Sequence, residues 1–281
     1  MIWYIFLKLL SESMLSFYPA MVKWIKFPIV NQLWGRLVVY TVISMIFMNW
    51  RGVWNYLFSW IGLILAAVNI LHIYTSYVGF NNLEAGVSYS IFYIYPLVIL
   101  LFSGWFKWWG IIPLIGAGLL GYSNWRDLVK EKEEEGKKKW LKGIGGILGA
   151  MITEVLLFFI VKRFGGDNKW NVLFIAYLLP AIVVSCVLNK RVLPRGEMDK
   201  KEWLKNVGIL LGVNGVIGAL GYYLRFYTIG KLPVVIYSGL SYFGIIMAYV
   251  YGWSLNKEKV GWFSLVGSLL IIIGGLLISK N

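Results

Sequence analysis

SYSIFYIYPLVILLFSGWFKWW, residues 88–109, decides the fold, because a close copy, IYSGLSYFGIIMAYVYGW, occurs again at residues 236–253. The matched pairs, all 148 residues apart, are Tyr89 with Tyr237, Ser90 with Ser238, Gly104 with Gly252 and Trp105 with Trp253. Each copy is apolar for about 20 residues, the length of helix that crosses the hydrocarbon core of a bilayer. The two copies therefore predict a duplicated membrane protein.

The bulk composition points the same way. Hydrophobic residues make up 59 % of the 281 positions, charged residues make up 14 %, and the mean hydropathy is +0.70. A soluble domain carries about 25 % charged residues, so we expect a multi-pass membrane protein without a large soluble domain. The net charge of +14 comes from basic residues in short loops. Contact with anionic lipid headgroups explains them better than nucleic acid does.

The sequence contains no pattern typical of an enzyme. It has no phosphate-binding glycine loop, no cluster of His or Cys and no nucleophile elbow. The single cysteine, Cys186, lies in an apolar run, which leaves no disulfide framework and no cysteine-based metal site. We expect a non-enzyme with no cofactor and no bound metal. The first apolar run has no basic segment before it, so no cleavable signal is expected.

Ten apolar stretches predict the fold class: an all-α integral membrane protein with ten transmembrane helices in two inverted five-helix repeats. The predicted spans are residues 2–22, 28–49, 58–79, 84–104, 108–125, 143–161, 170–189, 206–228, 232–253 and 260–279. The polar residues 126–142 separate the two sets of five spans. They predict a charged linker between a first repeat, residues 1–125, and a second repeat, residues 143–281.

The duplication extends beyond its most visible part. Glu12 pairs with Glu154 at an offset of 142 residues, and Gly116 pairs with Gly267 after three extra residues in the second copy. Because five is an odd number, the second copy must enter the membrane the other way up. Such inverted repeats are typical of secondary transporters, whose site lies at the repeat interface near the middle of the membrane.

The last third of the chain carries a recognisable pattern. A Leu232–Pro233 turn follows an aromatic-rich span, and Glu258 lies in the next turn. Gly267, Gly274 and Gly275 lie in the last helix, and Arg36 and Pro96 fit the same pattern in the first half. This pattern resembles that of EamA-type members of the drug/metabolite transporter superfamily. Departures are Phe106–Lys107, where a Glu-bearing turn is usual, and Gly244, where proline is frequent. The resemblance implies ten helices around a central substrate cavity.

Ionisable side chains inside the predicted spans are few, and each costs about 2.5–3.5 kcal/mol if it faces lipid at mid-depth. They are Lys8, Glu12, Arg36, His72, Glu154 and Arg225. Tyr4, Lys8, Glu12 and Ser16 recur every four residues and form one polar stripe on the first helix. Lys8 can reach Glu12, and Arg36 lies at a similar depth on the next span. The stripe predicts either a cavity wall or an internal ion pair that orients two helices.

Glu154 differs from Glu12, because its neighbours on its own helix are apolar. Desolvation disfavours an ionised carboxylate in such surroundings. Glu154 is therefore the predicted proton-coupling group. The alternative is a neutral acid that is hydrogen-bonded to a neighbouring helix.

Polar faces on the third and eighth spans are related by the repeat. His72 lies on the first face and Asn214 on the second, whereas Arg225 is close enough to the end of its span that we expect it to reach the membrane interface. A lone buried histidine such as His72 is more often a structural residue than a ligand. Tyr93 and Tyr242 lie deep in the fourth and ninth spans and are predicted to contact a small molecule. The predicted substrate-binding or coupling residues are Glu12, Glu154, Arg36, His72, Tyr93, Tyr242 and Asn214.

The sequence thus predicts a secondary-active transporter of small organic metabolites, amino-acid-like or drug-like, that works by alternating access, with proton coupling as an option. Two alternatives stay open. A nucleotide-sugar or sugar-phosphate exchanger would need cavity-facing cations, and a non-transporting membrane scaffold would need none. The expected partners are a small-molecule solute and the bilayer of the cell membrane, with a homodimer as a further option and no nucleic acid. The positive-inside rule favours termini outside the cell, whereas the family resemblance favours cytoplasmic termini.

Overall fold

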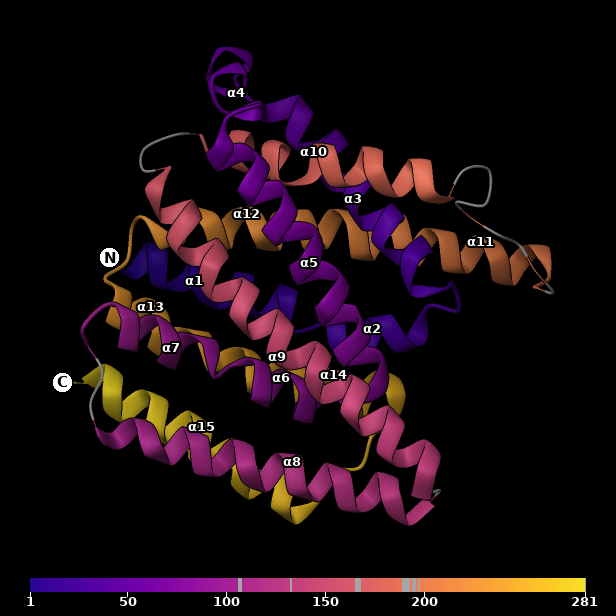
Figure 1. The fold of residues 1–281 in the computed structure, drawn as a ribbon, viewed down its shortest axis with the longest axis vertical. Helices are drawn as coiled ribbons and strands as arrows, with labels where there is room; N and C mark the ends of the chain where they lie inside the picture. Colours follow the sequence, from indigo (N-terminus) through magenta and orange to yellow (C-terminus); the bar gives the residue numbers. More distant parts are fainter. Residues whose placement is uncertain are drawn as a thin grey trace.

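The computed structural model describes residues 1–105, 108–131, 133–164, 168–188, 193, 196 and 198–280, and over these residues every regular element is a helix (Figure 1). The first half contains α1 (Ile2–Leu15), α2 (Tyr18–Trp24), α3 (Ile29–Phe47), α4 (Trp50–Leu57), α5 (Trp60–Asn82), α6 (Ala85–Phe92), α7 (Tyr95–Phe102), the 3₁₀ turn η1 (Trp108–Gly110) and α8 (Ile111–Glu131). The second half contains α9 (Glu133–Arg163), α10 (Lys169–Leu188), α11 (Lys200–Gly208), the π-helix η2 (Ile209–Ile217), α12 (Gly218–Ile229), α13 (Val234–Ser241), α14 (Phe243–Asn256) and α15 (Trp262–Lys280). Phe106 and Lys107 lie outside the described residues.

Eight helical segments are long and apolar enough to cross a membrane. They are Ile2–Trp24, Ile29–Phe47, Trp60–Asn82, Ala85–Phe102, Glu133–Arg163, Lys169–Leu188, Lys200–Ile229 and Val234–Asn256. The predicted fifth and tenth spans correspond to α8 and α15. Arg126, Asp127 and Lys130 interrupt the last turns of α8, and the apolar part of α15 is the shorter helix Trp262–Leu277. Ten spans in two repeats therefore stay a prediction.

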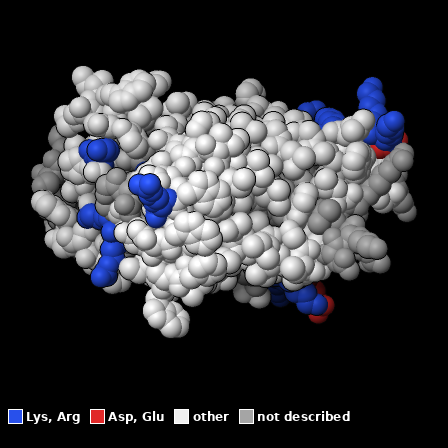
Figure 2. All heavy atoms as spheres, turned by 90° about the horizontal axis from the view of Figure 1, so that it is seen from above, with Lys and Arg blue, Asp and Glu red and all other residues white. Residues whose placement is uncertain are grey.

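The face of the molecule that Figure 2 shows has a middle without charged side chains. Figure 2 shows Lys, Arg, Asp and Glu at the two ends of the molecule and none across the area between them. Large apolar side chains are exposed on several of the helices, among them Ile46, Leu71, Ile152, Ile182 and Ile246. A contiguous apolar surface of this kind is covered by lipid in a membrane protein. Both chain termini lie at one end, and the junction of α8 and α9 lies at the other (Figure 1).

Helices from the two halves of the chain pack against one another in four main pairs. These are α5 with α9, α1 with α12, α3 with α10, and α8 with α15. Between α8 and α15, Gly116 and Gly267 meet face to face, because a side chain on either glycine would collide with the backbone carbonyl of the other. Small residues let two helix backbones approach this closely in a membrane.

Three of the spanning segments are broken near their middle. The first breaks at Ser16–Phe17 and the fourth at Tyr93–Ile94, each just before a proline, Pro19 or Pro96, that lies at the start of the next helix. Proline lacks the N–H that would continue the helical bonding. The ninth segment breaks at Tyr242. Tyr93 and Tyr242, which lie at two of these breaks, are both buried.

The eighth segment contains a different irregularity. Between α11 and α12, η2 is wound as a π-helix, a form that is rare and recurs at functional sites. It carries Asn214, which is fully buried. The apolar pattern did not predict this element, nor the short helix α4. In α4, Val53 and Leu57 face inward while Trp50 and Trp54 are exposed, as in a helix that lies at a membrane boundary.

Candidate functional site

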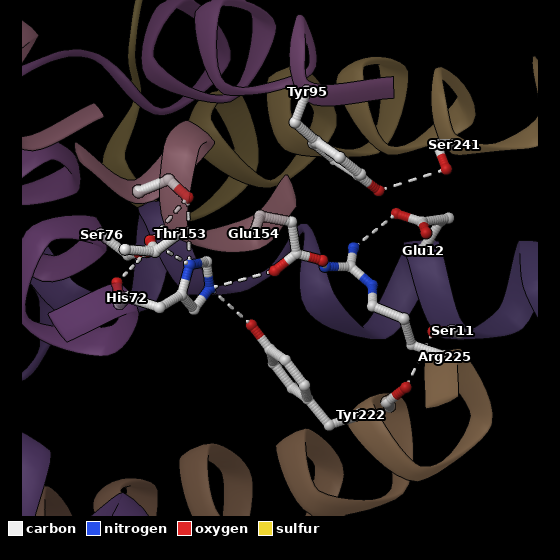
Figure 3. Close-up of polar contacts among 12 residues, drawn as sticks. Ser11, Glu12, His72, Ser76, Tyr95, Thr153, Glu154, Tyr222, Arg225 and Ser241 are labelled. Atoms are coloured by element: carbon white, nitrogen blue, oxygen red, sulfur yellow. Dashed lines mark hydrogen bonds and ion pairs between the residues drawn. The ribbon is translucent and has the colours of Figure 1, made fainter. Parts of the chain in front are cut away.

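A buried ion cluster occupies the centre of the bundle. Arg225 on α12 contacts two carboxylates: its Nη2 lies 2.9 Å from Oε2 of Glu12 on α1, and its Nη1 lies 2.7 Å from Oε1 of Glu154 on α9 (Figure 3). The side chains are at most 5 % exposed. Glu12 and Glu154 belong to different halves of the chain. One guanidinium therefore joins the two halves.

The predicted position of Arg225 was wrong. It was expected to extend to the membrane interface, but it is 1 % exposed. The reason is that α1 and α9 bring two carboxylates within reach of α12, and a bidentate guanidinium matches two such acceptors. Ser11 on α1 also donates a hydrogen bond to the carbonyl of Gly221, 2.8 Å away, which fixes α1 beside α12.

Glu12 has further partners on its own helix and on the fourth segment. Lys8 forms the predicted i to i+4 ion pair with it, and the hydroxyl of Tyr93 donates a hydrogen bond to it. The Lys8 ammonium also lies 3.5 Å from the centre of the Tyr237 ring. The predicted stripe of α1 is therefore an ion-paired seam, and its main interhelical cation is Arg225 rather than Arg36.

Glu154 also contacts His72 on α5. Oε2 of Glu154 lies 3.3 Å from Nε2 of His72, and that nitrogen lies 3.0 Å from the Tyr222 hydroxyl. Nδ1 of His72 lies 3.1 Å from the carbonyl oxygen of Ala150, which can only accept, so Nδ1 carries a hydrogen. The expectation of apolar surroundings for Glu154 was wrong, because its polar neighbours come from α5 and α12 instead of its own helix.

The contact between His72 and Glu154 depends on the protonation of the two side chains. In a neutral imidazole protonated on Nδ1, the other nitrogen is an acceptor, and it would meet the acceptor oxygen of a carboxylate. Adding one proton, to either the nitrogen or the oxygen, converts this contact into an attractive one. The Tyr222 hydroxyl, 3.0 Å from the same nitrogen, can donate to His72 when the imidazole is neutral.

Arg36 on α3 lies apart from the ion cluster, in a cage of tyrosines. Its guanidinium carbon is 4.5 Å from the ring centre of Tyr18 and 4.8 Å from that of Tyr222. Its Nη2 donates to the Tyr177 hydroxyl at 3.3 Å, while its Nε has no hydrogen-bond partner among the described residues. Arg36 makes no ion pair with Glu12, because Arg225 takes that place.

Asn214 adjoins the same cage. The Tyr77 hydroxyl donates to its Oδ1 at 3.1 Å, and the Tyr18 hydroxyl donates to its backbone carbonyl at 2.9 Å. Its Nδ2 is buried and has no hydrogen-bond partner among the described residues. Tyr18 and Tyr77 thus contact both Asn214 and the Arg36 guanidinium.

A small cavity of about 10 Å³ lies between the cage and the ion cluster. Its lining includes Tyr18, Arg36, His72, Ser76, Tyr222 and Arg225. This volume is about what one water molecule needs. The cavity between the described residues of the cage and the ion cluster is therefore too small for an organic solute.

The structure thus brings most of the predicted site residues together. Glu12, Glu154, His72 and Tyr93 belong to the ion cluster, and Arg36 and Asn214 belong to the cage. Tyr242 is separate, since its ring packs against Gly275 of α15. The prediction did not include the cage tyrosines. One signal was available, because Tyr40 follows Arg36 by four residues and so shares its helix face.

No metal site emerges from the part of the chain that the structure describes, where no three His, Cys, Asp or Glu side chains lie close enough to hold an ion.

Comparisons with known proteins identify a family and a solved structure of similar fold. Residues 141–280 match the model of the EamA-like transporter family. A solved structure titled only "Crystal structure of protein" has a TM-score of 0.60 to this chain at 14 % identity, and the match covers 98 % of this chain and 94 % of that one. At this identity the likeness concerns the fold alone. No curated protein matches the sequence.

Proposed function

The chain belongs to the EamA-like transporter family of the drug/metabolite transporter superfamily, and from this premise we propose that it moves small organic metabolites by secondary-active, alternating-access transport. It is an integral, multi-pass membrane protein. The observation that carries the proposal is the buried ion cluster, which joins the two halves of the chain beside a closed central cavity. Its membrane would be the cell membrane.

The helix contacts support an inverted repeat, which is typical of this mechanism. A two-fold axis that exchanges the halves would place α3, the second span, against α10, the seventh, and α8, the fifth, against α15, the tenth. The same axis would convert the contact of α5 with α9 into the contact of α12 with α1. All four contacts are present. Gly116 and Gly267, aligned by the repeat, touch each other, as equivalent residues do at a two-fold axis. We propose ten spans with repeats over residues 1–125 and 143–281, joined by the linker 126–142.

The ion cluster acts as the joint between the halves. Opening the cavity on the side of α12 requires Arg225 to leave Glu12 or Glu154. Breaking one partner out of a buried pair costs about 3–5 kcal/mol. A bound solute or a proton has to offset this free energy, because a ligand shifts a conformational equilibrium only by its differential affinity for the two states. The free energy needed to separate Arg225 from a carboxylate thus couples the movement of the helices to the binding of solute or proton.

We propose that His72 and Glu154 bind the proton whose movement is coupled to transport. A proton on Glu154 removes the charge that attracts Arg225, and so it loosens the contact between α9 and α12. The groups that face this pair are Arg225 and Tyr222 on α12, Thr153 on α9, Arg36 on α3, and Glu12 with Lys8 on α1. Protonation of the pair therefore acts on the whole cluster.

Reconstitution in liposomes tests this proposal. The purified protein would be assayed with neutral amino acids, amines and sugar nucleotides, by counterflow exchange and by accumulation under an imposed pH gradient. We expect Glu154→Gln to retain exchange and lose gradient-driven accumulation, while Glu134→Gln, an exposed change on the same helix, retains both. Full gradient-driven accumulation by Glu154→Gln would rule out coupling through this residue. Absence of saturable flux for every solute would favour the scaffold.

A further inference from the structure

Among the described residues of the ion cluster and the cage, Arg36 is the one buried cation without a carboxylate partner. The ion cluster contains two cations, Lys8 and Arg225, and two carboxylates, Glu12 and Glu154, which account for one another. Arg36 is 2 % exposed and belongs to none of these pairs. Counted with ordinary charges, the centre of the bundle holds one positive charge in excess.

The tyrosine cage offsets only part of this charge. A buried cation loses several kcal/mol of hydration, whereas a cation–π contact returns about 0.5–2 kcal/mol. A guanidinium has five N–H donors in a planar fork, and Nε of Arg36 has no partner among the described residues. The tyrosines therefore surround the guanidinium without replacing a counter-ion.

A second buried donor beside Arg36 also lacks an acceptor. Nδ2 of Asn214 has no partner, and Tyr18 and Tyr77 connect Asn214 to the cage around Arg36. Unpaired donors buried in a membrane protein cost free energy. Nε of Arg36 and Nδ2 of Asn214, together with the unbalanced charge of Arg36, match an anionic ligand with several hydrogen-bond acceptors.

The surface offers a basic depression that suits the same kind of ligand. At the end of the molecule that carries the termini, a pocket of about 640 Å³ is lined by Lys162, Lys169 and Lys231 and by the aromatic rings of Tyr223 and Tyr227. Among the described residues that line this pocket the charged side chains are all lysines, and a cleft lined by one sign of charge raises the local concentration of oppositely charged solutes. Tyr222 and Arg225, next to these tyrosines in sequence, line the closed central cavity.

We propose that Arg36, with Asn214 and the tyrosines of its cage, binds the carboxylate group of the transported solute. This inference rests on the proposed transport function and names the class of solute. A carboxylate accepts two parallel hydrogen bonds from a guanidinium, and its single negative charge balances the single excess cation. A phosphate ester would carry a second negative charge that the cage does not match. The rings of Tyr18 and Tyr222 would contact the apolar part of the solute.

Binding measurements on the detergent-purified full chain test the site. The probes are acetate, pyruvate, benzoate and phenylacetate, each compared with its neutral amide, and phenyl phosphate; titration calorimetry gives the affinity. We expect at least one carboxylate to bind more tightly than its amide. Arg36→Gln should weaken that binding by about ten- to a hundredfold, the worth of a hydrogen bond to a charged group. Arg36→Lys, which keeps the charge but not the fork, should weaken it less. The control Arg51→Gln, on the exposed surface of α4, should leave it unchanged.

Three outcomes overturn the inference. They are carboxylates that bind no better than amides in the unaltered protein, an affinity that Arg36→Gln leaves unchanged, and a preference for phenyl phosphate. The first and third use the unaltered chain, so they hold even where Arg36→Gln fails to fold. A separate liposome flux assay with the best carboxylate addresses transport. Arg36-dependent binding without flux would sustain this site and contradict the proposed function.

Discussion

Arg225 decides how the two halves are held together at the level of single residues. Its guanidinium satisfies one carboxylate from each half, and both contacts are shorter than 3 Å and buried. If Arg225 were missing, Glu154 would keep only the His72 contact, and the cluster would carry an excess negative charge.

We expect Arg225→Gln to lower the free energy of unfolding by about 3–5 kcal/mol, because it leaves a buried carboxylate unpaired. The double variant Arg225→Gln with Glu154→Gln should be markedly more stable than that single variant. In it, Lys8 and Glu12 still form a neutral pair. Thermal unfolding of the detergent-purified protein, followed by tryptophan fluorescence, measures both. Destabilisation of the double variant by the sum of the two single effects would contradict the coupling.

Sequence reasoning reached the ionisable residues but not all of their partners. The cost of charge in lipid singled out Glu12, Glu154 and His72 as inward-facing groups. The partner of both carboxylates, Arg225, lies 213 residues from Glu12 and 71 residues from Glu154. Only helix packing brings them together, and no periodicity along one helix contains that information.

At the scale of the elements, Glu258 connects three of them at the end opposite the termini. It lies in the turn between α14 and α15. Its Oε1 accepts from Nζ of Lys23 on α2 at 2.6 Å, and its Oε2 accepts from the backbone N–H of Ala85, the first residue of α6, at 2.7 Å. Glu84, which precedes α6, is mostly buried beside it. Burial, followed by the charge of Glu258, raises the pKa of Glu84 from 4.5 to about 7.

This raised pKa makes the end of the bundle sensitive to pH. The closed arrangement binds the Glu84 proton more tightly than an opened one, so its stabilising effect is present below about pH 4.5 and is lost as the pH rises through 7. We expect hydrogen exchange at the start of α6 to speed up between pH 5.5 and 8 beyond its intrinsic pH dependence. Glu84→Gln, which stays neutral, should remove that excess. An excess that survives in Glu84→Gln would assign it to another group.

The contact of α8 with α15 gives a second expectation for the elements. Gly267→Val should destabilise the protein by about 1–3 kcal/mol, because the new side chain meets the carbonyl of Gly116 and the adjacent Leu120. Gly118→Val is the matched control on α8, since the space around Gly118 is open. Thermal unfolding of both variants checks this. Equal stability of the two would mean that the helices are not closely packed there.

The sequence predicted those helices whose bounds depend on the length of an apolar stretch. It did not predict features that depend on how the backbone is wound locally. Pro96 marks a break in the fourth segment, and the Leu232–Pro233 turn separates α12 from α13 as its sequence suggests. The break at Tyr242 has no such residue. The π-winding of η2 leaves the apolar composition unchanged, so a hydropathy pattern does not register it.

For the whole molecule, the predicted odd number of spans per half fixes where the linker lies. With five spans in each half, residues 126–142 are on the membrane face opposite both termini. In a Cys186→Ser background, Lys138→Cys should react with an impermeant maleimide from one side of sealed vesicles, and an N-terminal tag should be digested from the other. Reaction of both from the same side would exclude five spans, and with them an inverted repeat. The same assay in oriented vesicles settles which face is cytoplasmic.

The overall class followed from composition alone, because an apolar content this high leaves few alternatives to a helical bundle in lipid. The arrangement around the site did not. Tyr18, Tyr40, Tyr177 and Tyr222 come from different segments, and their aromatic character is shared with the many tyrosines and tryptophans expected at membrane boundaries. Their common neighbour, Arg36, becomes visible only when those segments are placed side by side.

The π-wound stretch η2 has a mechanical consequence. Its hydrogen bonds reach one residue further than those of an α-helix, so it is underwound relative to α11 and α12 on either side. Rewinding it as α-helix would turn α12 about its long axis relative to α11 and lengthen the segment, because a π-helix holds more residues in each turn. Since Arg225 lies on α12, such a turn would change its position relative to Glu12 and Glu154. The winding of this one stretch thus sets the rotation of the helix that carries the residue between the two halves.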